Sequence, residues 1–509
     1  MTRQARPRGG CCGGWFLAAV LLALAPLTGR AQPADPAPFA LAGPTAGPDD
    51  DDLIVVAVAD APQALPGVGG TPRSDYRRLQ GYAGSTRSAD VAADVARDFR
   101  LTEQKFWAIQ PLHLRCMLYR VAPGADRDAV LAGLGRDARV QLAQPLNHFE
   151  TLQTPRTPQT PPITPAAPTS PSSPSPPTRQ SALQAAPQAH ADAPAYNDPY
   201  LGLQRGFAAV GAAEAQRFSR GAGVRVALID SGVDAQHPDL AGRIASQRDF
   251  VGGAHPVPAR GERHGTEMAG VIGAAANNAV GIVGIAPQAL LLAYRACWSV
   301  PGPAGAAGGG ADRAARCDSF TLAQALGAAI AADADIINLS LGGPADALLA
   351  RLALHAMQRG VIVVGALPAS GRRDGFPVGL AGVLAVGSSD DAPAPGAPAS
   401  AGPAGPAGPA GPAVLAAPGR DILTLVPGGA YDFASGSSLA AAHVSGALAL
   451  LRALSPGLPA ATAQRWLSAV PINVCAALQQ LRPAALCGGE HKSSAAAQPP
   501  GSAAALTPR

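Results

Sequence analysis

The sequence lacks three features that would indicate other classes of protein. It contains seven Cys but no Cys-x-x-Cys motif and no close Cys/His cluster, which disfavours a zinc protein. Beyond the N-terminal region it has no second apolar run long enough to span a bilayer. Residues 1–31 hold four Arg and no Lys or acid, so without them the formal charge of +4 falls to 4 − 4 = 0. A neutral chain argues against nucleic acid or an anionic membrane as its main partner.

The N-terminus predicts a secretory signal peptide over 1–31. Three Arg in the first eight positions precede an apolar stretch at 15–27, and Gly29-Arg30-Ala31 supplies a cleavage site with small residues. A single membrane anchor is the alternative, but the apolar stretch is too short for one. We therefore expect a secreted protein, extracellular or periplasmic, with no membrane contact after signal cleavage.

Apart from a lone Cys116, the Cys residues outside the signal indicate disulfides. Cys297 with Cys317, and Cys475 with Cys487, form two pairs that are close in the sequence, as expected of an exported domain. Zinc binding is the alternative for these four residues, and it lacks the usual ligand spacing.

Composition divides the rest of the chain. A compact region at 53–152 ends in a strand-helix-strand pattern and precedes a Pro/Thr/Ser-rich linker at 153–194. Residues 195–487 form the main domain, and 488–509 are expected to be a disordered tail. A short collagen-like repeat within 393–413 is expected to be a surface loop, because four triplets are too few for a triple helix.

The main domain alternates apolar strands with longer helical segments. Expected strands are 224–229, 289–295, 335–340, 361–366 and 383–387, and expected helices are 264–275, 321–332, 345–359 and 438–454. Continuous apolar strands that alternate with helices indicate an α/β fold, a parallel sheet with helices on both faces.

Three short motifs fall at the ends of these elements. VALIDSG ends a strand at Asp230, ERHGTEMAGVIG begins a helix at His264, and FASGSSLAAAHVSG begins another at Ser438. Each residue alone could be a turn or capping residue. Together, in this order, they resemble the D-[ST]-G, H-G-T-H and G-T-S-M-A-x-P-H motifs of the subtilisin-like serine proteases (subtilases).

The resemblance covers roughly 195–470, includes NDPY, HPDL, IINLSLGG and AAPG in register, and implies a subtilisin-like fold. It implies that Ser438 is the nucleophile, His264 its general base and Asp230 the group that orients His264. It also implies that 53–152 is a propeptide, an α+β domain that acts as intramolecular chaperone and inhibitor and is removed by the protease itself.

The substrate groove follows from the same resemblance. Ser340, Leu341 and Gly342 would pair by backbone hydrogen bonds with an extended peptide, and the opposing strand would lie near 296–300. Subtilases often carry structural calcium, and Asp198, Asp239 and Asn278 match ligand positions, although ordinary turn residues explain them equally well. No cofactor is required for the chemistry.

Four positions depart from the family motifs. Glu267 replaces the second His of H-G-T-H, Leu439 replaces Met and Ala442 replaces Pro. The family Asn that donates to the oxyanion falls on Ala369, and no Asn occurs between 339 and 472. The Ser370 hydroxyl or a backbone amide of that loop would have to replace it.

These observations predict a secreted serine endopeptidase, made as an autoprocessed zymogen and active as a monomer on proteins or peptides. The alternative is a pseudoprotease that binds peptides in the same groove without cutting them. The intact Asp230, His264 and Ser438 favour the enzyme.

Overall fold

The computed structural model describes residues 48–61, 85–154, 163–164, 196–252, 262–299, 314–391 and 413–483. The predicted signal peptide, the repeat within 393–413 and the tail at 488–509 lie outside the described residues, as does most of the predicted linker.

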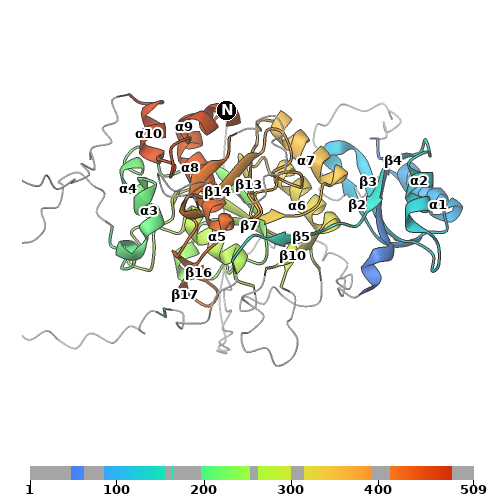
Figure 1. The fold of residues 1–509 in the computed structure, drawn as a ribbon, viewed down its shortest axis with the longest axis horizontal. Helices are drawn as coiled ribbons and strands as arrows, with labels where there is room; N and C mark the ends of the chain where they lie inside the picture. The colour runs from blue at the N-terminus through green and yellow to red at the C-terminus, as the bar shows by residue number, and fades with distance from the viewer. Residues whose placement is uncertain are drawn as a thin grey trace, which may run out of the picture. The chain divides into compact units, whose positions relative to one another are not determined.

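A seven-stranded parallel sheet forms the centre of the main domain (Figure 1). Its order is β15-β14-β13-β11-β6-β8-β7, and every neighbouring pair is parallel. The strands are β6 (Arg225–Asp230), β7 (Ile244–Asp249), β8 (Leu290–Arg295), β11 (Ile336–Leu339), β13 (Ile362–Ala366), β14 (Leu384–Ser388) and β15 (Leu415–Ala417).

Helices cover both faces of this sheet because its central strands are apolar at successive positions. Val226 and Leu228 pack in one core with α5 (His264–Gly273) and α8 (Ser437–Leu454). Ala227 and Ile229, which point the other way, pack with α6 (Ser319–Ala331) and α7 (Ala347–Gln358). The predicted α/β fold with a doubly covered parallel sheet is therefore confirmed.

Helix α8 runs through the core. Among the described helices it alone is long and apolar enough to cross a membrane, and most of it is buried inside the protein. The main domain also contains α3 (Arg205–Ala209), α4 (Ala212–Ala215), the hairpin β16 (Ile422–Val426) and β17 (Ala430–Ala434), α9 (Ala460–Trp466) and α10 (Val474–Gln479).

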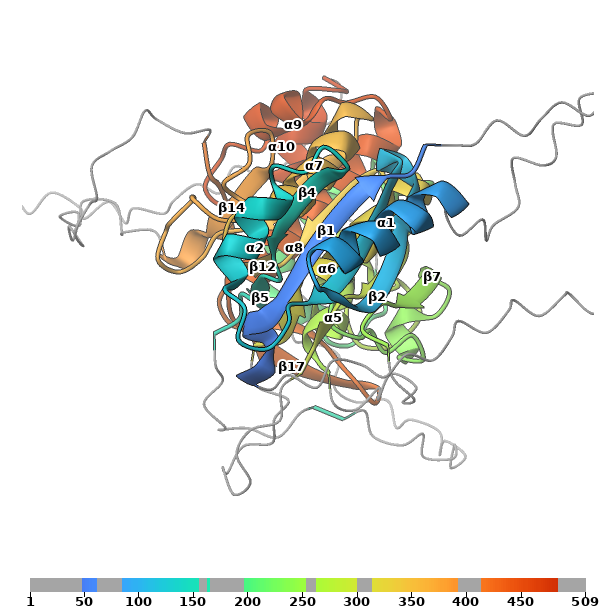
Figure 2. The ribbon, with the colours of Figure 1, turned by 90° about the vertical axis from the view of Figure 1, so that its right-hand side faces the viewer.

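The N-terminal region is a separate antiparallel sheet with helices on one face. The sheet order is β2-β3-β1-β4, and both helices lie on the same side of it (Figure 2). The elements are β1 (Leu53–Ala59), α1 (Thr86–Asp98), β2 (Thr102–Ile109), β3 (Leu114–Arg120), α2 (Arg127–Leu134) and β4 (Val140–Pro145).

The other face of the N-terminal sheet packs against α6 and α7. The Trp107 ring lies close against Gly327: a Cβ atom at position 327 would be 2.7 Å from this ring. Asp346 at the start of α7 accepts hydrogen bonds from the side-chain amides of Gln144 (2.6 Å) and Asn147 (2.9 Å). Apolar packing and buried polar contacts therefore join the N-terminal region to the main domain.

A second four-stranded sheet connects the two regions. Its order is β12-β5-β10-β9, made of β5 (His148–Thr151), β9 (Cys297–Trp298), β10 (Arg316–Asp318) and β12 (Leu341–Gly342). The strand expected at the end of the N-terminal region is thus divided: β4 stays in its own sheet, while β5 crosses to the main domain.

The predicted Cys297–Cys317 disulfide is present and joins β9 to β10. Cys475 is also disulfide-bonded, and its predicted partner Cys487 lies outside the described residues. The expected position of the strand opposite 340–342 was wrong: β10, not 296–300, pairs with β5. β9, which begins at Cys297, pairs with β10 on the side opposite β5.

Candidate active site

Asp230 and His264 form a buried hydrogen-bonded pair. Asp230 ends β6 and His264 begins α5, and the Asp230 Oδ1 to His264 Nδ1 distance is 2.7 Å. Burial acts to lower the pKa of His264, but the charge and hydrogen bond of Asp230 outweigh it, so this pKa is raised. The carboxylate thus fixes the ring and stabilises its protonated form.

Ser438 lies in the first turn of α8, where the helix dipole favours negative charge. Its Oγ is 2.7 Å from the carbonyl oxygen of Leu152 and 3.1 Å from that of Ser340. Its backbone N–H also donates to the Leu152 oxygen, at 3.3 Å. The Leu152 carbonyl therefore lies beside the hydroxyl and the backbone N–H of the predicted nucleophile.

Gly436 makes this close approach possible. A Cβ at this glycine would lie 2.6 Å from the Leu152 oxygen and 3.0 Å from Gln153 Cα, and its φ of +144° is one that other residues rarely adopt. Thr154 N–H then donates to the Ser435 carbonyl at 2.9 Å, which holds the chain on the far side of Leu152.

Backbone pairing holds the segment before Leu152. Leu152 N–H donates to the Ser340 carbonyl at 3.0 Å, and Leu341 and Gly342 are in register with Thr151 and Glu150. On the opposite side, β10 pairs with β5. The three residues predicted to line the groove thus contact an extended segment of this same chain.

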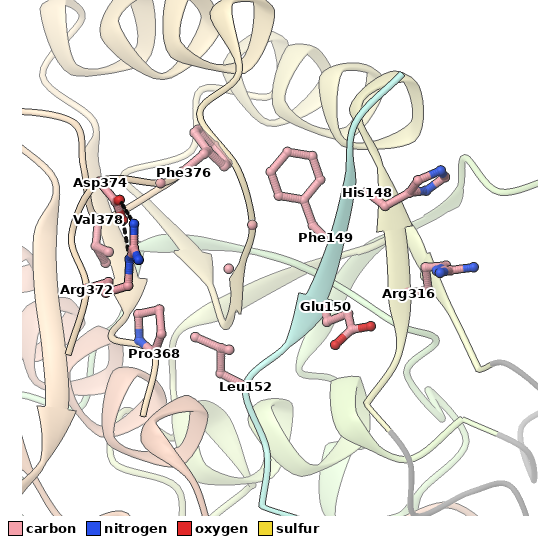
Figure 3. Close-up of a pocket in the computed structure, with 13 residues that line it drawn as sticks. His148, Phe149, Glu150, Leu152, Arg316, Pro368, Arg372, Asp374, Phe376 and Val378 are labelled. Atoms are coloured by element: carbon pink, nitrogen blue, oxygen red, sulfur yellow. Dashed lines mark hydrogen bonds and ion pairs between the residues drawn. The ribbon is translucent and has the colours of Figure 1, made fainter. Parts of the chain in front are cut away.

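A cavity of about 400 Å³ lies beside this segment. Figure 3 shows Leu152 directed toward Pro368 and Phe149 directed toward Phe376. The two phenyl rings meet edge to face, with centroids 5.9 Å apart. The residues that line the cavity are His148, Phe149, Glu150, Leu152, Arg316, Gly342, Gly343, Pro368, Arg372, Asp374, Gly375, Phe376 and Val378.

The predicted oxyanion loop borders the cavity at Pro368, but Ala369 and Ser370 are exposed. Ser370 Oγ accepts a hydrogen bond from Arg372 N–H at 3.4 Å. Among the hydrogen bonds between described residues, none joins Ser370 to the Leu152 carbonyl. Its role as an oxyanion donor stays a prediction.

The predicted general base, His264, has a ring nitrogen without a partner in the described part of the chain. This nitrogen is Nε2, and it is buried. A free ring nitrogen is what the predicted role of His264 as proton acceptor for Ser438 requires. Ser438 N–H, which already donates to the Leu152 carbonyl, matches the predicted role of an oxyanion donor.

Glu267 belongs to a cluster that the sequence motifs did not reveal. Its carboxylate accepts hydrogen bonds from Gln153 Nε2 at 2.6 Å and Arg263 Nε at 3.2 Å, and Arg263 also pairs with Asp432 at 3.1 Å. Burial raises the pKa of Glu267, which Arg263 and His264 oppose. The change from the family His was the only signal at this position in the sequence.

The predicted calcium ligands are engaged with nitrogen donors. Asp239 accepts hydrogen bonds from Asn278 Nδ2 and Ile282 N–H, both at 2.8 Å, and Asp198 accepts one from Asn277 N–H at 2.9 Å. Calcium takes roughly six to eight oxygen ligands. This network presents an amide nitrogen to Asp239 and does not fit calcium as it stands, so the metal stays a prediction from the resemblance alone.

A histidine hydrogen-bonded to a buried aspartate, together with a serine in the first turn of another helix of a parallel α/β fold, is the set of groups that serine hydrolases use. Residues 221–478, about half of the chain, match the model of the Subtilase family (Peptidase_S8). The chain belongs to this family, and its enzyme class is serine endopeptidase. Subtilases need no cofactor for catalysis.

Curated relatives agree with this assignment. Thermitase of Thermoactinomyces vulgaris is 33% identical over 258 residues, which cover 50% of this chain and 84% of thermitase. Subtilisin Savinase of Lederbergia lenta is 35% identical, with 46% and 78% covered. The major intracellular serine protease of Bacillus subtilis (strain 168) is 32% identical, with 46% and 69% covered.

Among solved structures, fervidolysin of Fervidobacterium pennivorans, described as a keratinolytic enzyme related to subtilisin, matches with a TM-score of 0.55. The match covers 84% of this chain and 61% of that one at 18% identity. At this identity the similarity concerns the fold, and it extends beyond the 258 residues shared with thermitase.

Proposed function

We propose that the chain is a secreted serine endopeptidase made as a zymogen, which cuts its own Leu152–Gln153 bond. The observation that carries the proposal is the Leu152 carbonyl oxygen, 2.7 Å from Ser438 Oγ and hydrogen-bonded to Ser438 N–H. In acyl transfer the serine attacks the carbonyl carbon while backbone N–H groups hold its oxygen, and the Ser438 N–H contact supports the Leu152 carbonyl as that group. Secretion rests on the signal pattern at 1–31.

Residues 53–152 would act as the inhibitor of the uncut enzyme. Support comes from β5, which fills the groove between β10 and β12 by backbone pairing. The sheet behind it adds apolar packing against α6 and α7. A segment held in this way excludes other peptides from Ser438, and it would continue to do so after one bond is cut.

The substrate class follows from the side chains that fill the cavity. We infer a preference for extended peptides with a large apolar residue such as Leu before the scissile bond. The Phe149–Phe376 contact supports an aromatic residue three positions further upstream. Proteins with such segments exposed would be cut, without a metal or cofactor in the chemistry.

The test is to express the full chain and Ser438→Ala in parallel and treat both with a fluorophosphonate probe. We expect the wild type to be labelled and to yield a fragment whose N-terminal residue is Gln153, and Ser438→Ala to show neither. An unlabelled and unprocessed wild type would favour a pseudoprotease. Labelling together with cleavage at another position would support the protease activity but show that Leu152–Gln153 is not the bond that is cut.

A further inference from the structure

Glu267 is a buried acid that contacts the residue directly after the proposed scissile bond. Its Oε2 accepts a hydrogen bond from Gln153 Nε2 at 2.6 Å. Gln153 follows Leu152, whose carbonyl oxygen lies beside Ser438. The Gln153 side chain thus occupies the place that the first residue of the leaving fragment takes in any substrate cut here.

The charges around the Gln153 side chain favour a substrate side chain that donates an N–H over one that carries a carboxylate. Arg263 lies between the carboxylates of Glu267 and Asp432, and the side chains of these two acids are only 1% and 4% exposed. With all three groups ionised the cluster carries one net negative charge. A side chain that donates an N–H is therefore matched, whereas a carboxylate would be desolvated next to like charge.

We propose that Glu267 is a specificity-determining residue that selects glutamine, or another side chain with an N–H donor, directly after the scissile bond and disfavours Asp and Glu there. The inference rests on the proposed function, because it takes Leu152–Gln153 as a cleavable bond. It concerns a position at which this chain departs from the family motif, so it is a property of this chain.

A purely structural role for Glu267 has a different consequence. As an acid in the first turn of α5, paired with Arg263 four residues earlier, it would stabilise the helix whatever peptide is bound. Its loss would then change stability or overall activity equally for all peptides. The ratio of kcat/KM between two peptides separates these roles, because it is independent of the amount of active enzyme.

The test uses two peptides that copy residues 147–156, one with Gln and one with Glu at the position of Gln153. The full-length wild type is allowed to process and its active sites are counted with the fluorophosphonate probe. We expect it to prefer the Gln peptide by about tenfold or more in kcat/KM, the range for a hydrogen bond to a buried charged group. In Glu267→Gln the preference should fall below about threefold. The matched control Glu214→Gln, on α4, should keep it.

A second variant changes the residue after the proposed scissile bond and leaves Glu267 and its neighbours unchanged. Gln153→Glu in the full chain should slow autoprocessing by a similar factor. Equal cleavage of both peptides by a labelled wild type would overturn the inference and leave the proposed function intact, as would an undiminished preference in Glu267→Gln. A wild type that is neither labelled nor processed would overturn both.

Discussion

At the scale of single residues, the oxyanion position is the main departure from the family. Ala369 offers no side-chain donor where the family has an Asn amide. Among the described residues, the one N–H bonded to the Leu152 carbonyl comes from Ser438 itself. Loss of one such donor lowers turnover by about 10² to 10³, a figure that comes from a member of this family. The enzyme is therefore expected to be slow but not inactive.

Ser370→Ala tests whether a neighbouring hydroxyl replaces that amide. We expect kcat to fall less than about threefold, because Ser370 is exposed and no hydrogen bond between described residues joins it to the Leu152 carbonyl. Steady-state kinetics on a Leu-Gln peptide give kcat and KM separately. A loss of tenfold or more in kcat at constant KM would instead identify the hydroxyl as the oxyanion donor.

Leu439 predicts that activity resists peroxide. The residue after the nucleophile is buried and has no thioether to oxidise, unlike the Met of the family motif. After incubation in dilute peroxide we expect at least about half of the activity to remain, whereas Leu439→Met should lose most of it. Equal losses in both proteins would contradict the prediction and indicate another oxidised residue.

At the scale of elements, the four residues of β5 connect the N-terminal region to the active site. One short strand pairs with β10 and β12 on its two sides and leads directly into Leu152. Its register decides which carbonyl reaches Ser438. A shift of one residue would exchange the side chains that enter the cavity with those that leave it.

Removal of the Cys297–Cys317 disulfide should impair peptide binding as well as stability. The bond fixes β9 to β10, which is the strand that pairs with the bound segment. For a sequence separation of 20, the general estimate for such a crosslink is about 3 kcal/mol. We expect the Cys297→Ser/Cys317→Ser double variant to show a lower Tm and a several-fold higher KM. A lower Tm with unchanged KM would show that the bond does not shape the groove.

The sequence predicted the elements of the main domain well because their apolar runs are long and buried. The helix expected at 438–454 is observed at Ser437–Leu454, and the strand expected at 361–366 at Ile362–Ala366. Short motifs mark Asp230, His264 and Ser438 as candidates, and the structure shows the hydrogen bond between the first two. The strand β10 has three residues and follows a segment without periodicity, so its pairing with β5 left no pattern to detect.

The contact between Gln153 and Glu267 could not be predicted for a different reason. The two residues are 114 positions apart, and both have ordinary roles where they stand, in a linker and in the first turn of a helix. Only the path of β5 through the groove brings them together. Side-chain contacts created by such long-range pairing have no spacing that a single sequence reveals.

At the scale of the whole molecule, stability should decrease in mild acid because of His443. Burial lowers its pKa from 6.5 to about 4, against the opposing hydrogen bond to the Leu439 carbonyl. Between these values the unfolded chain binds a proton that the folded chain does not, so acid favours unfolding. The difference of 6.5 − 4 = 2.5 units corresponds to an upper value of about 3 kcal/mol.

Urea unfolding at pH 7, 5.5 and 4 measures this effect, with Ser438→Ala as the parent to prevent self-digestion. We expect the free energy of unfolding to fall from pH 7 to 4, and to fall less in a parent that also carries His443→Gln. Parallel decreases in the two proteins would assign the acid sensitivity to other groups.

The bridge between Ile163 and Tyr431 on β17 has a consequence for the chain if Leu152–Gln153 is cut as proposed. Ile163 is ten positions after Gln153 (163 − 153 = 10), so cleavage would free an amino terminus that stays anchored a short distance from the groove. Such a tethered end would compete with substrate for the groove, and its effective concentration would depend on the length of the tether and not on the enzyme concentration. Removal of the residues between 153 and 163 would then raise activity at any enzyme concentration. The segment that blocks the groove belongs to the same molecule, so dilution does not remove it.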